Sequence, residues 1–335
     1  MKKLLQYIFK SPLVWLANKF SAAPKKDKVF DSLSNLFLSA PIESDRRVKL
    51  IDTNLKDARF IVFSDQHKGD KSAADDFANN EENYVAALNY YNKEKFTFIN
   101  LGDSEELWKF NPLKILSLNE KSFAVEAKFQ PNRFYKTFGN HDLVWKNKAD
   151  VFLFLRKYFK MPLIINEGIV IKVKTEKTSL NIFLTHGHQG DAMSDNNWFS
   201  TWLVAHIWMP VQRFLEVNVN TPSKDFSLRN KHNIMMSDWS ALQEKLILIT
   251  GHTHSPVFAS GRYLDHPSNN IYGEQVKNIK PSYFNTGCCC FDDGDITGIE
   301  IDNGFIRLIK WHKENAISKK MILEEIEINT LINDL

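Results

Sequence analysis

Five short polar blocks in this sequence carry side chains of the kinds that bind divalent metal ions. They lie at residues 64–67 (SDQH), 102–106 (GDSEE), 139–142 (GNHD), 186–188 (HGH) and 251–254 (GHTH). Six of the ten histidines lie in these blocks, and none of the cysteines does. Aspartate, histidine and asparagine are ligands for borderline or hard cations such as Mn, Fe or Zn. The blocks therefore predict a metal site with oxygen and nitrogen ligands.

The spacing inside the first and last blocks predicts chelation. Asp65 and His67 lie two residues apart, so their side chains leave an extended segment on the same side and can bind one ion together. His252 and His254 repeat this spacing. Each pair therefore places two ligands at the same edge of the fold.

The middle blocks supply what a pair of ions needs. Two divalent ions about 3.5–4 Å apart can clamp the attacking and leaving oxygens of a phosphoryl transfer. Their mutual repulsion must be offset by a bridging carboxylate, and we expect Asp103, which follows an apolar run and a glycine, to be that bridge. Asn140 adds a neutral carbonyl oxygen, and His186 completes the second ion.

Four further polar side chains lie beside these ligands. His141 is placed to donate a proton to the leaving oxygen, and Asp142 would hold its ring in the required tautomer. Glu106 would orient a ligand or its backbone turn, the alternative being an exposed helix residue. His188 would contact a ligand or the substrate, the alternative being a solvated loop residue.

Each block directly follows a short apolar or β-rich run. The runs lie at residues 59–64, 96–101, 133–138, 180–185 and 246–250. Residues 73–94, between the first two runs, carry apolar side chains at a spacing that predicts a helix. Strands that alternate with helices indicate βαβ units with buried parallel strands. Such folds bind ligands at the carboxyl ends of their strands, where all five blocks lie.

The C-terminal part follows another pattern. Residues 283–291, 296–301 and 305–311 are typical of successive strands with turns between them, and predict an antiparallel meander. The three cysteines are consecutive, residues 288–290, and point to alternate faces of a strand. They therefore cannot all ligate one metal or form a disulfide framework, and we expect buried small hydrophobic residues in a reducing compartment.

The basic charge gathers at the N-terminus. The chain has 335 residues, 43% of them hydrophobic and 25% charged, and a net charge of +3. Residues 1–30 contain seven lysines and one aspartate, so the remainder is net acidic, and we do not expect nucleic acid as a partner. Apolar residues alternate with these lysines, which predicts either an anchor on an anionic membrane surface or a helix that packs on the body.

We expect a basic amphipathic segment at residues 1–50, one main domain at 51–315 and a C-terminal tail at 316–335. An insertion at about 191–242 contains residues 198–212, which lack Asp, Glu, Lys and Arg and include Trp202 and Trp208. This predicts a helical element beside the active face. It would either cap an apolar substrate site or simply pack on the core.

The order DxH, GDxxE, GNHD, HGH, GHTH resembles that of the calcineurin-like metallophosphoesterase superfamily, over roughly residues 60–303. The resemblance implies an α/β (α+β) fold, a four-layer αββα sandwich, here with an inserted helical cap. It implies a first ion at Asp65, His67 and His254, a second at Asn140, His186 and His252, Asp103 as the bridge and His141 as the acid. We expect two divalent ions, Mn first, with Fe, Zn or Co as alternatives.

Residues 102–108 (GDSEELW) also resemble the GDxxExW motif of the UDP-2,3-diacylglucosamine pyrophosphohydrolases, which carry a helical cap and are peripheral to membranes. His141 departs from that branch, which has arginine at this position. The narrower resemblance implies an amphipathic nucleotide-lipid substrate. The chain would then be cytoplasmic and held at the inner face of the membrane.

The reaction implied is hydrolysis of a phosphate ester or pyrophosphate, by attack on phosphorus of a hydroxide held between the ions. The substrate would be a phosphorylated small molecule or lipid. One alternative is a general protein or nucleotide phosphatase or phosphodiesterase. An alternative of another class is a non-catalytic scaffold that keeps the fold and binds partners, a reading that usually goes with lost ligands.

Overall fold

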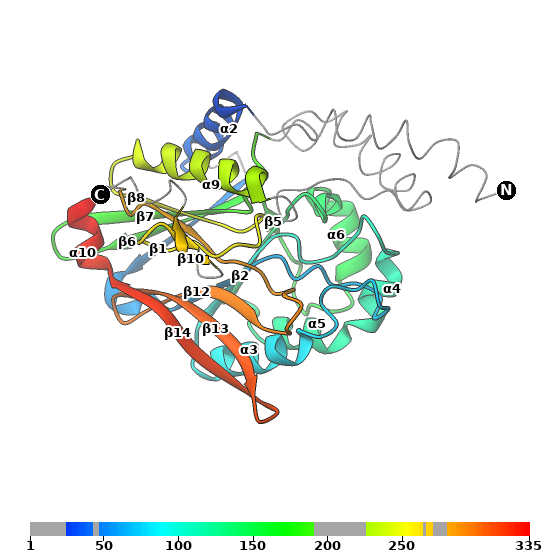
Figure 1. Cartoon of the computed structure of the whole chain (residues 1–335). Helices are drawn as coiled ribbons and strands as arrows, with labels where there is room; N and C mark the ends of the chain where they lie inside the picture. Colours follow the sequence, from blue (N-terminus) through cyan, green and yellow to red (C-terminus); the bar gives the residue numbers. More distant parts are fainter. Residues whose placement is uncertain (1–24, 43–46, 191–225, 264–265, 271–279) are drawn as a thin grey trace.

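The apolar runs form two main sheets. The structure is a computed structural model that describes residues 25–42, 47–190, 226–263, 266–270 and 280–335 (Figure 1). The seven-stranded sheet has the order β14 (Ile317–Glu327), β13 (Phe305–Glu314), β12 (Ile296–Asp302), β2 (Phe60–Phe63), β3 (Thr97–Leu101), β4 (Phe134–Thr137), β5 (Ile165–Asn166). The five-stranded sheet has the order β1 (Val48–Asn54), β6 (Gly168–Lys174), β7 (Ser179–Thr185), β8 (Leu246–Thr250), β11 (Tyr283–Asn285). A small separate pair consists of β9 (Arg262–Tyr263) and β10 (His266–Asn270).

The two sheets pack face to face over an apolar core. Val62 and Ile99 of the seven-stranded sheet lie in one buried cluster with Ile171, Leu184 and Ile249 of the five-stranded sheet. The central strands β2, β3 and β8 are buried almost along their whole length because helices cover their outer sides. This core holds the two sheets in a fixed relation, so that loops from both can build one site.

Helices cover both outer faces. On the seven-stranded sheet lie α3 (Glu81–Lys93), α4 (Pro112–Leu118), α5 (Glu120–Ala127) and α6 (Lys148–Leu155), which share a buried cluster with Ile61 and Phe98. On the five-stranded sheet lie α2 (Lys26–Leu38) and α9 (Phe226–Ala241), which Figure 1 shows along the opposite side of the molecule. A short helix, α10 (Ile328–Asp334), ends the chain. The four layers are the αββα sandwich that the resemblance implied.

All five predicted runs are strands, and every block follows the end of one. The first three runs are β2, β3 and β4, which pair in parallel, and the last two are β7 and β8, also parallel. The blocks therefore meet at the carboxyl ends of strands from two facing sheets.

The helix predicted for residues 73–94 begins later, at Glu81. Asp75 explains the delay, because its carboxylate accepts hydrogen bonds from the backbone N–H groups of Lys71 and Phe77 and stabilises local turns instead. Phe77 still enters the core from this irregular segment.

The predicted meander is wrong at its first strand. Residues 283–291 give only the three-residue β11, which pairs in parallel with β8 in the other sheet. The antiparallel meander is β12, β13 and β14. Residues 316–335, set apart in the sequence as a tail, form β14 at the sheet edge and α10, whose Ile328 and Leu331 lie in the core between the sheets.

The end of the basic N-terminal segment belongs to the body. Helix α2 buries Val29, Leu33 and Leu36 against the five-stranded sheet, and β1 pairs with β6. Residues 1–24 and most of the insertion, including Trp202 and Trp208, lie outside the described residues. Within the described residues, no helix has both the length and the apolar character needed to cross a membrane.

We predict that Leu33→Ala lowers the free energy of unfolding by about 2–5 kcal/mol, the usual effect of removing a buried leucine side chain. Leu33 is 0% exposed, whereas Leu38 on the same helix is 66% exposed. Urea unfolding of Leu33→Ala beside the control Leu38→Ala measures this. Equal, small effects would show that α2 is not part of the folded body.

Candidate metal centre

At five of the candidate ligands the backbone has the left-handed conformation, which residues other than glycine rarely adopt. Asp65, His67, Asp103, His252 and His254 have φ angles of 52°, 49°, 49°, 68° and 55°. Left-handed backbone at non-glycine residues is uncommon, and it gathers at functional sites where the surrounding structure compensates its cost. Five of the seven candidate ligands therefore share one kind of strain.

Glycines bring the loops close to the two aspartates. A Cβ at Gly139 would collide with Asp103 Oδ1, and one at Gly251 would collide with Asp65 Oδ2 and Ser64 Oγ. The glycines of the GNHD and GHTH blocks therefore allow carboxylates from neighbouring loops to lie against the backbone. The first block is fixed further by the N–H of His252, which donates to Asp65 Oδ2 at 3.0 Å.

Three side chains converge at the position expected for the first ion. His67 Nε2 and His254 Nε2 lie 3.0 Å apart. Asp65 Oδ1 lies 3.2 Å from His254 Nε2 and 3.8 Å from His67 Nε2. Asp65 and His67 are buried and His254 is partly exposed. Two imidazole nitrogens and a carboxylate oxygen at this spacing suit one divalent cation.

Asp103 lies between this group and a second one. Its Oδ2 is 3.7 Å from His67 Nε2 and 3.2 Å from His186 Nε2. Asp103, His186 and His252 form a buried group whose candidate ligand atoms lie within 4.8 Å of one another. The same carboxylate thus faces both groups, as the predicted bridge requires.

Asn140 provides the test of whether a cation fits the second group. Its Oδ1 is buried and has no hydrogen-bond partner among the described residues. A buried carbonyl oxygen without a partner is costly, so a site of this kind calls for a ligand that accepts its lone pair. The donor set of carboxylate, imidazole and amide oxygen fits a divalent metal ion.

In three candidate histidine ligands, the ring nitrogen Nδ1, which points away from the site, contacts another protein group. His67 Nδ1 contacts Glu106 Oε2 at 3.1 Å, and His186 Nδ1 lies 3.0 Å from the carbonyl oxygen of Leu101. His254 Nδ1 lies 3.6 Å from Cys290 Sγ. Such contacts fix the tautomer and orientation of a metal-binding imidazole, so that Nε2 points into the site. From the sequence, Cys290 was expected only to be a buried hydrophobic residue, because its contact with His254 is tertiary.

The His141 ring contacts Glu106 rather than Asp142. Its Nδ1 lies 2.9 Å from Glu106 Oε1, and the Trp108 ring stacks on it at 4.0 Å between ring centroids. Asp142 instead accepts hydrogen bonds from the backbone N–H groups of Gly139 and Ser104, at 2.6 and 2.9 Å. The tautomer-holding contact expected from Asp142 is therefore made by Glu106, and Asp142 joins two of the loops. Glu106 is buried, not an exposed helix residue.

The charges around the site favour ionised carboxylates. Burial alone would raise the pKa of Asp103, but the neighbouring His186 and His141 outweigh it and hold the pKa below its usual range. The pKa of Asp65 is lowered in the same way, against burial, by His254 and His186. Ionised aspartates within this buried group present negative charge to a cation.

Two imidazoles beside the second group are held neutral. Burial, with the charge of His186, lowers the pKa of His188 to about 3 and that of His232 to about 4. His188, expected from the sequence, is buried with its ring 5.4 Å from that of His186. His232 was not expected; it comes from α9 and its ring lies 5.1 Å from that of His252. Its position could not be found from sequence because no strand end or motif precedes it.

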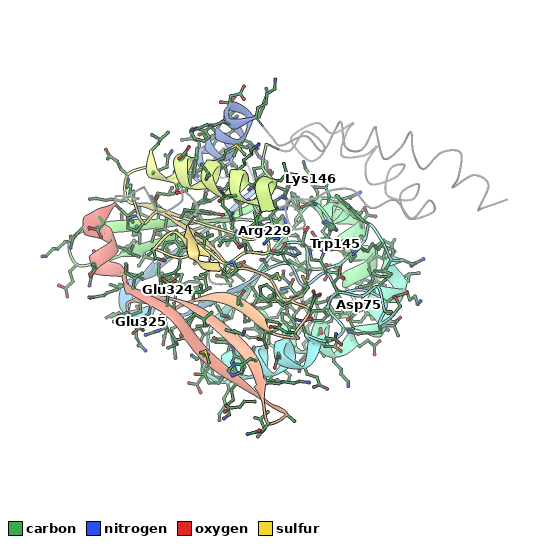
Figure 2. All side chains as sticks on the ribbon, in the orientation of Figure 1. Asp75, Trp145, Lys146, Arg229, Glu324 and Glu325 are labelled. Carbon is green, nitrogen blue, oxygen red and sulfur yellow. The ribbon has the colours of Figure 1, made fainter. Side chains whose placement is uncertain are left out.

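A buried network of opposite charges supports the second block from below. Lys136 contacts Glu105 at 2.7 Å, and Lys68 contacts Glu126 at 2.6 Å and Glu105 at 3.3 Å. Trp145, labelled in Figure 2, donates its indole N–H to Glu105 at 2.7 Å. The two lysines balance the two glutamates, so this network adds no net charge while it fixes the residues that flank Asp103 and Glu106.

We predict that the purified protein binds close to two divalent ions and that Asp103→Ala loses more than one of them, because its carboxylate faces both groups. Metal analysis after dialysis measures the loss, with Asp302→Ala, a carboxylate remote from these loops, as the control. An unchanged metal content in Asp103→Ala would contradict the bridging role.

Comparisons with known proteins give the family. The sequence model of the calcineurin-like phosphoesterase family matches residues 58–256, more than half of the chain. None of the curated proteins matches the chain significantly.

Solved structures of vacuolar protein sorting 29 (Vps29) are similar at low identity. That of Cryptosporidium parvum is 12% identical, with a TM-score of 0.34, over 81% of this chain and 98% of that one. That of Entamoeba histolytica with bound zinc is 16% identical, with a TM-score of 0.33, over 81% and 99%. On its sequence match, this chain belongs to the calcineurin-like phosphoesterase family.

Proposed function

We propose that the protein is a dinuclear metal-dependent hydrolase of phosphate esters or pyrophosphates. The observation that carries this proposal is the position of the Asp103 carboxylate, which faces His67 on one side and His186 on the other. Two divalent ions bound there would supply Lewis-acid activation of water and of the phosphoryl oxygens. The set of ligands fits Mn, Fe, Zn or Co, and we favour Mn.

His141 is the proposed proton donor to the leaving oxygen. Its ring is only partly buried, and its Nδ1 is held by Glu106, which leaves Nε2 for the substrate. Stacking of Trp108 on the ring limits its rotation. Glu106 contacts both His141 and His67, so one carboxylate sets the orientation of the proposed acid relative to the first group of ligands.

A non-catalytic scaffold is the rival of another class. A scaffold of this fold has no need for complete ligand sets, whereas all seven candidate ligands here lie in the loops that meet at the strand ends. Metal-dependent hydrolysis of nitrophenyl phosphate mono- and diesters by the purified protein distinguishes the two. If the protein binds two ions but hydrolyses neither these esters nor a nucleoside diphosphate ester, it is a scaffold.

Within the enzyme class, the proposed substrate is amphipathic, a nucleotide-linked lipid met at the inner face of the membrane. The support is the resemblance of residues 102–108 to the lipid-specific branch, together with the lysine-rich N-terminus and the apolar insertion. The rival is a general protein or nucleotide phosphatase. Activity on an acylated nucleotide diphosphate compared with the same compound without acyl chains separates these substrates.

We predict that His141→Ala lowers turnover of an alkyl phosphate by about 10²–10⁴-fold, the usual contribution of a positioned general acid. The loss should be much smaller for a nitrophenyl ester, whose leaving group needs no proton, and the metal content should stay unchanged. Steady-state kinetics on both esters, with His312→Ala as the control, measures the difference. Equal losses on the two esters would remove His141 from the role of acid.

A further inference from the structure

The surface formed by α6 and the segment after it carries large exposed apolar side chains, whereas the surface of a water-soluble protein is usually polar. Phe152, Leu153, Met161 and Ile164 are 60%, 69%, 53% and 65% exposed. Contiguous exposed apolar side chains of this size mark sites that contact a partner or a membrane. We call residues 145–165 the α6 surface.

The inner side of the same element shows why these side chains are not core residues. Val151, Leu155 and Phe159 are 5%, 1% and 5% exposed and pack toward the seven-stranded sheet. One side of α6 thus provides the contacts with the core. Phe152 and Leu153 lie on the other side and are exposed, and among the described residues the Arg156 guanidinium lies over the Phe152 ring, 4.9 Å from its centroid.

A cavity opens between these side chains. Its volume is about 260 Å³, and it is lined mostly by apolar groups, among them Trp145, Leu155, Phe159 and Ile164. Two basic residues, Lys148 and Arg156, also line it. An apolar cavity with basic side chains at its margin suits a molecule that has a hydrocarbon part beside an anionic part.

The charge of the α6 surface is one-sided. Its exposed side chains include five basic residues, namely Lys146, Lys148, Arg156, Lys157 and Lys160. The acidic residue in the same stretch is Asp150, and Glu120 of α5 lies 3.5 Å from Lys157. Apolar side chains surrounded by lysine and arginine are typical of surfaces that enter the interface of an anionic bilayer.

From the exposed apolar side chains, the cavity and the surrounding basic residues, we propose that the α6 surface docks on an anionic membrane, with Phe152 and Leu153 among the lipid acyl chains. A second copy of the chain fits less well, because a two-fold interface would place the same basic residues against each other. The surface follows His141 closely in sequence, and Trp145 joins the cavity to Glu105 beside Asp103.

The location of contact is tested with a polarity-sensitive fluorophore on Leu153→Cys in the full chain, with Ile317→Cys as the matched control. Ile317 is 62% exposed and begins β14, which is the opposite edge strand of the seven-stranded sheet from β5, the strand that follows α6. Labelled protein without either substitution gives the background from the native cysteines. With vesicles of phosphatidylcholine and phosphatidylglycerol, emission at position 153 should shift to the blue and be quenched by lipids that carry a nitroxide on the acyl chain. Position 317 should show neither effect.

The energetic test uses binding to the same vesicles by flotation. Phe152→Ser with Leu153→Ser should weaken binding at least tenfold, whereas Ile317→Ser with Met321→Ser should not. Lys157→Gln with Lys160→Gln should weaken binding to anionic vesicles and leave the weak binding to pure phosphatidylcholine unchanged. All substituted side chains are exposed, so folding should be unaffected, and activity on a soluble nitrophenyl ester should stay the same.

Four results would overturn the proposal. The first is no spectral change at position 153 with vesicles, and the second is equal binding of the wild-type chain to anionic and neutral vesicles. The third is an emission at position 153 that is already blue-shifted without vesicles. The fourth is a concentration-dependent dimer that Phe152→Ser with Leu153→Ser abolishes. The third would mean that the protein itself covers the surface, and the fourth that a second copy does. None of these results depends on whether the metal centre is catalytic.

Discussion

Three buried carboxylates lie around one imidazole, and the rest of the site depends on how their negative charge is compensated. Asp65 Oδ1, Asp103 Oδ2 and Glu106 Oε2 lie 3.8, 3.7 and 3.1 Å from the ring nitrogens of His67. Removing this much negative charge from water is costly unless positive charge compensates it nearby. Lys109 lies 3.5 Å from Glu106 and offsets part of this charge, whereas Lys68 and Lys136 are already paired with Glu126 and Glu105. The neighbouring imidazoles lower the pKa values of Asp65 and Asp103. Divalent cations would compensate the same carboxylates while the imidazoles bind as neutral ligands, and this is the physical basis of the proposed metal centre.

The fold meets this constraint with strand ends from two sheets. Asp65, Asp103 and Asn140 follow strands of the seven-stranded sheet, whereas His186 and His252 follow strands of the five-stranded one. The apolar core between the sheets fixes the distance between the two sets of loops. The strained backbone at the ligands and the glycines that admit the carboxylates are compensated by this rigid support.

The sequence predicted what depends on local pattern. The five apolar runs, their parallel pairing and the blocks at their ends follow from periodicity and from the rule for strand ends. It did not predict contacts between distant segments. Glu106 rather than Asp142 contacts His141, Cys290 contacts His254, and His232 reaches the site from α9, each through a side chain whose neighbours are set by tertiary packing. The late start of α3 and the short β11 likewise depended on side-chain hydrogen bonds and sheet partners that no periodicity reports.

The central claim is that one carboxylate holds two ions together, and anomalous X-ray diffraction from crystals grown with Mn²⁺ tests it most directly. The account predicts two anomalous peaks about 3.5–4 Å apart, the usual separation in two-metal sites. One peak should lie within bonding distance of Asp65, His67 and His254, the other within bonding distance of Asn140, His186 and His252, and both should be bonded to Asp103. A single peak, or two peaks that do not share Asp103, would contradict the account.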